Sequence, residues 1–180
     1  MDLFEAIKKR HSYRGGFENK PIPRDHLRQI VQAGLDAPSG CNVQTTRFVI
    51  VDDPNLVQTI AGMHEKNKAF RQAQAFIACI VDEQPKAVYQ EMSFQVEDCA
   101  AAVENMLLAI TALGYGSVWV DGWLRVDGRA EAIGQRLNLP AGKRIRVLLP
   151  VGIPSEAYKQ PTKMPFEQRA WFNQYGADKQ

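Results

Sequence analysis

The chain has 180 residues, of which 45% are hydrophobic and 23% are charged, and its formal net charge at pH 7 is +2. These values lie near the averages of globular domains, so they exclude a disordered chain, a collagen-like chain and a disulfide scaffold. At this length we expect one domain spanning residues 1–180, with enough buried surface to fold without a metal or a disulfide.

The first half of the chain predicts helices and strands in alternation. Apolar residues recur at helical spacing in three segments, and short runs rich in β-branched residues indicate two strands. Asp53 followed by Pro54 is typical of an N-cap with proline at the first helical position. The predicted elements are helices over 2–10, 25–35 and 54–62, a turn-rich loop over 37–42, and strands over 47–51 and 76–81.

Residues 91–113 form the strongest helical pattern of the chain. Apolar residues recur there at alternating spacings of 4 and 3 over three heptads, which is typical of a helix with one long buried stripe. The stripe consists of Met92, Val96, Cys99, Val103, Met106, Ile110 and Leu113. Two alternatives stay open, because such a stripe packs either inside one domain or against a second copy of the chain.

The last third of the chain predicts a strand over 117–120, a helix over 127–137 and a strand over 144–151. The final segment contains four large aromatic residues, Phe166, Trp171, Phe172 and Tyr175. A solvated tail has little use for such residues. We therefore expect this segment to pack on its own chain or on a partner subunit.

The sequence favours a cytoplasmic protein without a membrane partner. The N-terminus has acids where a secretory signal has bases and an apolar core. The most apolar stretch, residues 100–120, contains Glu104 and Asn105, so it falls short of the roughly 20 apolar residues of a membrane span. The three cysteines are odd in number and widely spaced, which is typical of reduced thiols.

Two polar segments are suited to ligand binding. Residues 8–14 contain four bases and no acid, and arginines beside a small hydroxyl suit a phosphate. In residues 38–44, the amides of Asn42 and Gln44 offer donors and acceptors to the edge of a planar heterocycle. The plain alternatives are a solvated helix end and an ordinary turn. No metal-ligand spacing, P-loop or dinucleotide-binding fingerprint is found, so no metal site is expected.

Taken together, these segments resemble the FMN-dependent nitroreductase family. Residues 10–14 are similar to the family's R-R/H-S-x-R opening, and residues 37–44 are similar to its A-P-S-x-x-N-x-Q loop. Further similarity lies in residues 97–109, 114–119, 139–142 and 150–154. The motifs occur in the family's order over nearly the whole chain.

The resemblance implies an α+β fold, a three-layer sandwich with a mainly antiparallel central sheet. It also implies an intertwined homodimer with two FMN sites at its interface. The long helix would then lie at the dimer interface, and residues 155–180 would form a C-terminal arm on the partner subunit.

The resemblance further implies the cofactor contacts. Arg10, Ser12 and Lys163 would hold the FMN phosphate, with His11 and Arg14 beside the ribityl phosphate or the flavin ring. These residues come from both ends of the chain, so folding must bring them together.

The loop before the first strand would contact the ring. Asn42 and Gln44 would meet the isoalloxazine edge and the ribityl chain. Pro38 and Ser39 would approach the flavin of the other subunit.

Backbone groups of Asp121 and Gly122 would lie near flavin N5. The implied function is two-electron transfer from NADH or NADPH, through the flavin, to a nitroaromatic, a quinone or a similar electron-poor acceptor. Both substrates would use one place in turn, by a ping-pong mechanism. No side chain needs to act as acid or base, so no catalytic residue is assigned.

Three features depart from the family pattern. Thr45 and Thr46 stand where the family usually has Pro-Trp, which removes a packing aromatic. Pro161 stands where a second C-terminal base is common, and Lys159 is the alternative base. The chain is also short for the family, so we expect an open active site.

Two other functions would use the same residues. A non-catalytic protein that stores or senses FMN would share every binding residue, and steady-state oxidation of NADH or NADPH with an added quinone would separate the two. A basic nucleic-acid module would depend on residues 8–14 alone, and the low net charge argues against a nucleic-acid partner.

Overall fold

The computed structural model describes residues 1–158 and 160–177. The helices are α1 (Leu3–Lys9), α2 (Arg24–Leu35), α3 (Pro54–Ala61), α4 (Lys68–Arg71), α5 (Gln95–Ala112) and α6 (Arg129–Arg136). The strands are β1 (Arg47–Val51), β2 (Ala75–Asp82), β3 (Gly116–Ser117) and β4 (Lys143–Gly152). Short 3₁₀ turns cover Gly40–Asn42, Gly122–Arg125 and Phe166–Gln168.

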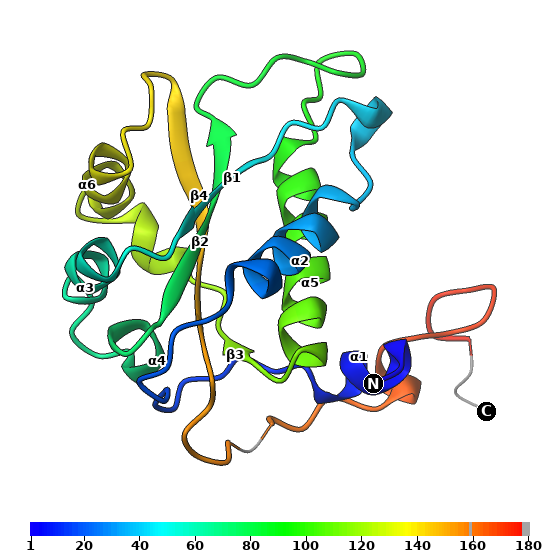
Figure 1. Cartoon of the computed structure of the whole chain (residues 1–180). Helices are drawn as coiled ribbons and strands as arrows, with labels where there is room; N and C mark the ends of the chain where they lie inside the picture. The colour runs from blue at the N-terminus through cyan, green and yellow to red at the C-terminus, as the bar shows by residue number, and fades with distance from the viewer. Residues whose placement is uncertain (159, 178–180) are drawn as a thin grey trace.

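The four strands form one sheet between two layers of helices (Figure 1). The strand order is β1–β2–β4–β3, and every neighbouring pair is antiparallel. Helices α3, α4 and α6 cover one face of the sheet, and α2 and α5 cover the other. The expected α+β sandwich with an antiparallel sheet is confirmed. Among the described residues, no helix is both long enough and apolar enough to cross a membrane.

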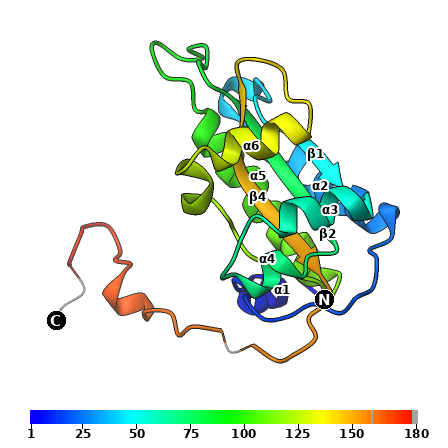
Figure 2. The same cartoon turned by 90° about the vertical axis from the view of Figure 1, so that its left-hand side faces the viewer.

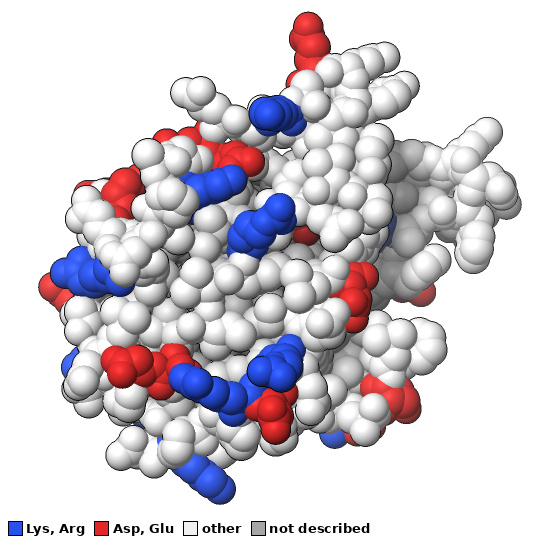
Figure 3. Space-filling model, turned by 45° about the horizontal axis from the view of Figure 1, so that its top comes forward, with Lys and Arg blue, Asp and Glu red and all other residues white. Residues whose placement is uncertain are grey.

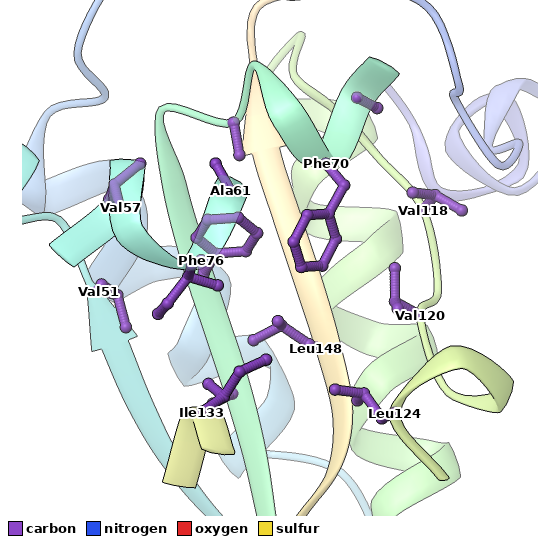
Figure 4. Packing of buried hydrophobic residues seen from close by; sticks show 14 of the residues in the cluster. Val51, Val57, Ala61, Phe70, Phe76, Val118, Val120, Leu124, Ile133 and Leu148 are labelled. Atoms are coloured by element: carbon purple, nitrogen blue, oxygen red, sulfur yellow. The ribbon is translucent and has the colours of Figure 1, made fainter. Parts of the chain in front are cut away.

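The two faces of β2 and β4 supply two separate hydrophobic cores. Phe76 and Leu148 point to one side and pack with Phe70 of α4 and Ile133 of α6 (Figure 4). Neighbouring residues of the same strands point to the other side, toward α2 and α5. Side chains alternate along a strand, so a central strand can be buried on both faces.

The apolar stripe of α5 packs inside the chain. Cys99, Val103, Met106 and Ile110 are all at most 1% exposed, and they contact α2 and the sheet. These four residues thus pack inside one domain, whereas Met92 and Val96, at the start of the stripe, are 45% and 47% exposed. That the long helix also lies at a dimer interface stays a prediction. The homodimer itself stays a prediction.

Helix α5 begins at Gln95, four residues after the predicted start at position 91. Phe94 has a φ of 55°, and a left-handed residue cannot continue a right-handed helix. The N–H of Met92 donates instead to the carbonyl of Tyr89 at 3.0 Å, which closes a turn. The predicted start was too early because Met92 continues the apolar spacing of the helix, although its side chain is 45% exposed and lies outside the helix.

Strand β3 is also shorter than the predicted strand over 117–120. Its ladder with β4 covers Gly116 and Ser117, and contact resumes only at Val120, which exchanges two hydrogen bonds with Leu148. Pro150 lies opposite the gap. The N–H of Leu148 donates to the segment that follows β3, and residue 150, two positions along β4, faces the same segment. Proline has no N–H to donate there, so the ladder is interrupted.

The segment after β4 leaves the sandwich. In the view of Figure 2 it runs away from the sheet and its helices. Phe166, Phe172 and Tyr175 are 56%, 70% and 90% exposed, whereas Trp171 is half-buried, so three of the four tail aromatics are not buried on their own chain. An arm on a partner subunit stays a prediction. On the face that Figure 3 displays, acidic and basic side chains are interspersed.

A glycine pair places the N-terminal segment against the end of the sheet. A Cβ added at Gly152 would lie 2.7 Å from Phe17 Cβ and Cδ1, and one added at Gly116 would lie 3.1 Å from the same ring. Gly152→Ala should therefore destabilise the fold by overpacking, by about 1–3 kcal/mol. Thermal unfolding should show a lower midpoint, by about 2–4 °C per kcal/mol at this size.

The matched control for this variant is Gly62→Ala. An added Cβ there has no neighbour closer than 3.4 Å, which is ordinary van der Waals contact. If both variants unfold at the wild-type temperature, the slot for Phe17 is not tight.

Candidate functional site

The N-terminal motif runs along the edge of the sheet next to β3. Helix α1 ends where the Arg10 N–H donates to the Ala6 carbonyl, and the chain is extended after it. The N–H of Tyr13 donates to the carbonyl of Ser117 at 2.8 Å. The Tyr13 ring is 2% exposed and its hydroxyl donates to the carbonyl of Gly16 at 2.6 Å. These contacts fix the motif to the sheet.

Arg10 joins three parts of the chain. Its Nε lies 3.3 Å from Oε1 of Glu104 on α5, and its side chain is 19% exposed. Its carbonyl accepts a hydrogen bond of 2.9 Å from Nε2 of Gln160. The C-terminal segment therefore passes the motif before it leaves the body.

His11 presents an unpartnered nitrogen. Its Nδ1 lies 2.8 Å from the Lys9 carbonyl. A carbonyl only accepts, so Nδ1 carries the hydrogen and Nε2 of the neutral ring is an acceptor. Nε2 is buried and has no partner among the described residues. The ring of Tyr158 is parallel to that of His11, with the centroids 5.9 Å apart.

Ser117 presents a second unpartnered atom, its buried Oγ. His11, Ser117 and Arg10 line one cavity of about 50 Å³, together with Leu107 and Thr111 of α5. Buried polar atoms nearly always have hydrogen-bond partners, in the protein or in ordered water. Two unpartnered atoms in the lining of one cavity are therefore available to polar groups of a ligand or to water.

The remaining residues of the predicted phosphate group are arranged differently. Ser12 is half-buried, whereas Arg14 is exposed and its Nη1 donates to the Ser12 carbonyl at 3.4 Å. Lys163 is exposed and lies three residues after Gln160, within about 10 Å along the chain. The structure joins Arg10, His11 and Ser12 and does not bring Lys163 into contact with them. Lys159 lies outside the described residues.

The second polar segment is a strained loop. Cys41, Asn42 and Gln44 have φ values of 48°, 57° and 54°, in the left-handed region. Ser39 Oγ accepts a hydrogen bond of 3.0 Å from the N–H of Gln44. Pro38, Asn42 and Gln44 are exposed, and such strain is typical of functional loops.

Asp121 is the centre of an ion-pair network. Its carboxylate accepts two hydrogen bonds of 2.6 Å from Arg125 and another from Arg146. Burial raises the pKa of Asp121, but the hydrogen bonds and charges of the two arginines lower it further, so the net pKa is below its usual value of 3.8. The Asp121 side chain is thus fully engaged by the two arginines. At Gly122, by contrast, the space beside the backbone is open, since no atom lies within 4 Å of the position that a Cβ would take.

The residue after Gly122 anchors this segment. The ring of Trp123 stacks on His64, with centroids 4.7 Å apart, and the Arg129 guanidinium lies 4.9 Å from its centroid. Desolvation, and then the Arg129 charge, lower the pKa of His64. The stack fixes the backbone at positions 121–122.

The motif and the loop contact opposite sides of α5. The loop donates to Asp98 in the first turn of the helix, and the motif's cavity includes Leu107. Nine residues separate these two positions, which is about 14 Å and 2.5 turns. Within one chain, the two predicted halves of the site therefore face away from each other.

The comparisons with known proteins identify the family of this chain. The model of the nitroreductase family matches residues 7–63 and 61–153. This chain belongs to the nitroreductase family. The matched ranges include the motif, the loop and positions 121–122, whereas Lys163 lies beyond them.

Several relatives match most of the length of this chain. A protein of Methanothermobacter thermautotrophicus, provisionally named NADH dehydrogenase/NAD(P)H nitroreductase, is 28% identical over 156 residues, 87% of this chain and 79% of that protein. An NADPH-dependent oxidoreductase of Staphylococcus aureus is 26% identical over 99% of this chain and 76% of that protein. A solved structure from Desulfovibrio desulfuricans, in complex with FMN, has a TM-score of 0.77 and 29% identity, covering 93% of this chain and 94% of that one.

Sequence reasoning missed the residues that hold the three segments in place. Asp98, Glu104 and Arg146 are single charged residues on predicted elements, and nothing in their spacing links them to the loop, to Arg10 or to Asp121. Trp123 was the exception, because a large aromatic residue directly after the predicted site residue Gly122 could have indicated that this segment is anchored by packing.

The lowered pKa of Asp121 predicts a pH dependence of stability. Because the folded-state pKa is below the unfolded value, the ionised carboxylate stabilises the fold above about pH 3.8, and this contribution is lost as the pH falls through the folded pKa. Asp121→Asn should be less stable than wild type at neutral pH, and the two unfolding midpoints should converge below that window.

Arg125→Ala supplies the control for this effect. In the Asp121→Asn background it should cause little further loss, since its partner is already gone. Midpoints that stay equally far apart from pH 7 to pH 2 would rule out the ion-pair explanation.

Proposed function

We propose that this chain binds FMN and passes two electrons from NADH or NADPH, through the flavin, to an electron-poor acceptor such as a nitroaromatic or a quinone. The observation that carries the proposal is the pair of unpartnered buried atoms, His11 Nε2 and Ser117 Oγ, beside Arg10. Membership of the nitroreductase family supports it, as do the names of the NAD(P)H-dependent relatives and the FMN-bound neighbour.

The donor set around the cavity fits a ribityl phosphate. The ion pair of Arg10 with Glu104 is long, with 3.3 Å between Nε and Oε1. Arg10 would therefore give up this contact for the phosphate, since charge-assisted hydrogen bonds to phosphate are strong. The Ser12 hydroxyl would add a donor. His11 Nε2 would accept a hydrogen bond from a ribityl hydroxyl, because its Nδ1 already donates to Lys9. Lys163 would approach from the C-terminal segment.

The ring side of the site requires a second copy of the chain. A flavin held by the motif would lie on the side of α5 opposite its own loop. The loop of a partner would therefore supply all four predicted ring contacts, Pro38, Ser39, Asn42 and Gln44. The homodimer follows from this arrangement and does not depend on the apolar stripe of α5.

When bound, FMN supplies a ring that accepts hydride and passes on its electrons. The protein's part is to bind and orient this ring. The backbone N–H of Gly122 would stand near N5, on a segment fixed by the Trp123 stack. Arg10 would stabilise negative charge by a preorganised contact. The carboxylate of Asp121 is held by two arginines, so it would not move protons.

The absorbance spectrum of the purified protein tests this proposal, together with turnover. We expect a flavin spectrum and steady-state oxidation of NADH or NADPH with an added quinone. A flavin-bound protein without turnover would indicate a storage or sensing role. A colourless protein that cannot be loaded with FMN would contradict the proposal.

The phosphate contact predicts a difference between two ligands. One charge-assisted hydrogen bond contributes about 1.5–3 kcal/mol, so Arg10→Ala should weaken FMN binding roughly 10- to 100-fold. Riboflavin has no phosphate, so its dissociation constant should barely change. Lys163→Ala should behave in the same way. Titration of each variant with both ligands measures the effect.

Lys8→Ala is the matched control, because Lys8 is an exposed base on α1. It should bind both ligands like wild type. If Arg10→Ala loses affinity for FMN and riboflavin equally, the variant is misfolded. If it loses affinity for neither, Arg10 only pairs with Glu104 and does not contact the phosphate.

The second-copy requirement predicts the effect of removing the tail. We expect sedimentation to show a dimer, and deletion of the chain from Phe166 onward should weaken both the dimer and its retention of FMN. The exposed aromatics of this segment, Phe166 and Tyr175 among them, would lose their surface on the partner. A wild-type protein that sediments only as a monomer with flavin bound would contradict the arrangement.

A further inference from the structure

Both oxygens of a buried carboxylate on α5 accept hydrogen bonds from the strained loop. Asp98 is 7% exposed and lies in the first turns of the helix. Its Oδ1 accepts a hydrogen bond of 2.8 Å from the N–H of Gly40, and its Oδ2 accepts one of 2.8 Å from the Thr45 hydroxyl. One carboxylate thus contacts the loop near both of its ends.

The loop between these contacts is held away from its relaxed conformation. Three residues without the freedom of glycine, Cys41, Asn42 and Gln44, have positive φ. Such conformations persist only where surrounding contacts over-determine them. Gly40 also packs closely on Phe94, since an added Cβ would lie 2.7 Å from that ring.

Within the described residues, no lysine, arginine or histidine forms an ion pair with Asp98. Its two hydrogen bonds to the loop are the compensation that a buried carboxylate requires. An apolar residue of similar size would fill the same space without this requirement, so packing alone does not explain a carboxylate here.

We propose that Asp98 is a positioning residue for the cofactor. Through Gly40 and Thr45 it holds the loop in the conformation that presents Ser39, Asn42 and Gln44 outward. This proposal rests on the proposed function, since those side chains are the predicted ring contacts. Thr45, a departure from the family pattern, acquires a role because the proline usual at that position has no hydroxyl.

The Thr45 hydroxyl gives the sharpest variants. Thr45→Val keeps the branched shape and removes the hydrogen bond to Asp98, whereas Thr45→Ser keeps the hydroxyl. We expect Thr45→Val to weaken FMN binding roughly tenfold and Thr45→Ser to restore it to near the wild-type value. Equal affinity of Thr45→Val and wild type would overturn the proposal.

The carboxylate itself is tested by Asp98→Ala and Asp98→Asn. The asparagine retains an acceptor for the Gly40 N–H, so its loss of FMN affinity should be smaller than that of the alanine variant. Glu97→Gln is the matched control, since Glu97 lies in the same turn and its side chain is exposed. It should bind FMN like wild type.

Hydrogen exchange of the FMN-free protein separates this proposal from the proposed function. Loss of the clamp should speed exchange at Gly40 and Gln44 in Thr45→Val, while exchange along the rest of α5 stays near that of wild type. If wild type binds no FMN, the proposed function fails and the exchange still tests the clamp. Unchanged exchange in Thr45→Val, or faster exchange throughout α5, would contradict a positioning role.

Discussion

The packing of α5 between the sheet and α2 is the contact on which the rest of this structure depends. Val103, Met106 and Ile110 are each at most 1% exposed, and burial of each such side chain contributes about 1.5–3 kcal/mol. The helix is therefore fixed to its own chain along the buried part of its apolar stripe, from Cys99 to Ile110. Everything attached to its other sides takes its position from it.

Two such attachments define the proposed site. The N-terminal motif meets α5 at Glu104 and Leu107, and the strained loop meets it at Asp98. Around the axis of a rigid helix, Leu107 lies about half a turn and Glu104 about a third of a turn from Asp98. Arginine and amide groups suited to one cofactor thus stand on opposite sides of one chain, and two copies are needed to bring them together.

The sequence was most informative where local chemistry decides the structure. Strand β1 has the predicted bounds, and Asp53 caps α3 by accepting from the N–H of Leu56. Prediction failed where contacts distant in sequence decide. Pro150 interrupts a ladder 30 or so residues earlier in the chain, and apolar spacing ran past Phe94, whose left-handed backbone delays α5.

The same limit applies to the site. The motif and the loop were visible as residue types, because phosphates and heterocycles need those donors. Their partners were not, since Asp98 lies 53 residues from Thr45 and Glu104 lies far from Arg10 in the sequence. The unpartnered nitrogen of His11 appears only once Lys9 fixes the tautomer and the fold buries the ring.

Complementation between two defective chains tests the shared site most directly. Arg10→Ala damages the motif, and Asn42→Asp removes the loop's amide donor while keeping a residue that tolerates the left-handed backbone. After equal mixing and subunit exchange, sites built from two chains should regain wild-type FMN affinity in about one quarter of all sites, because each mixed dimer contains one intact pair. No regained sites after confirmed exchange would show that the two halves do not meet across the dimer.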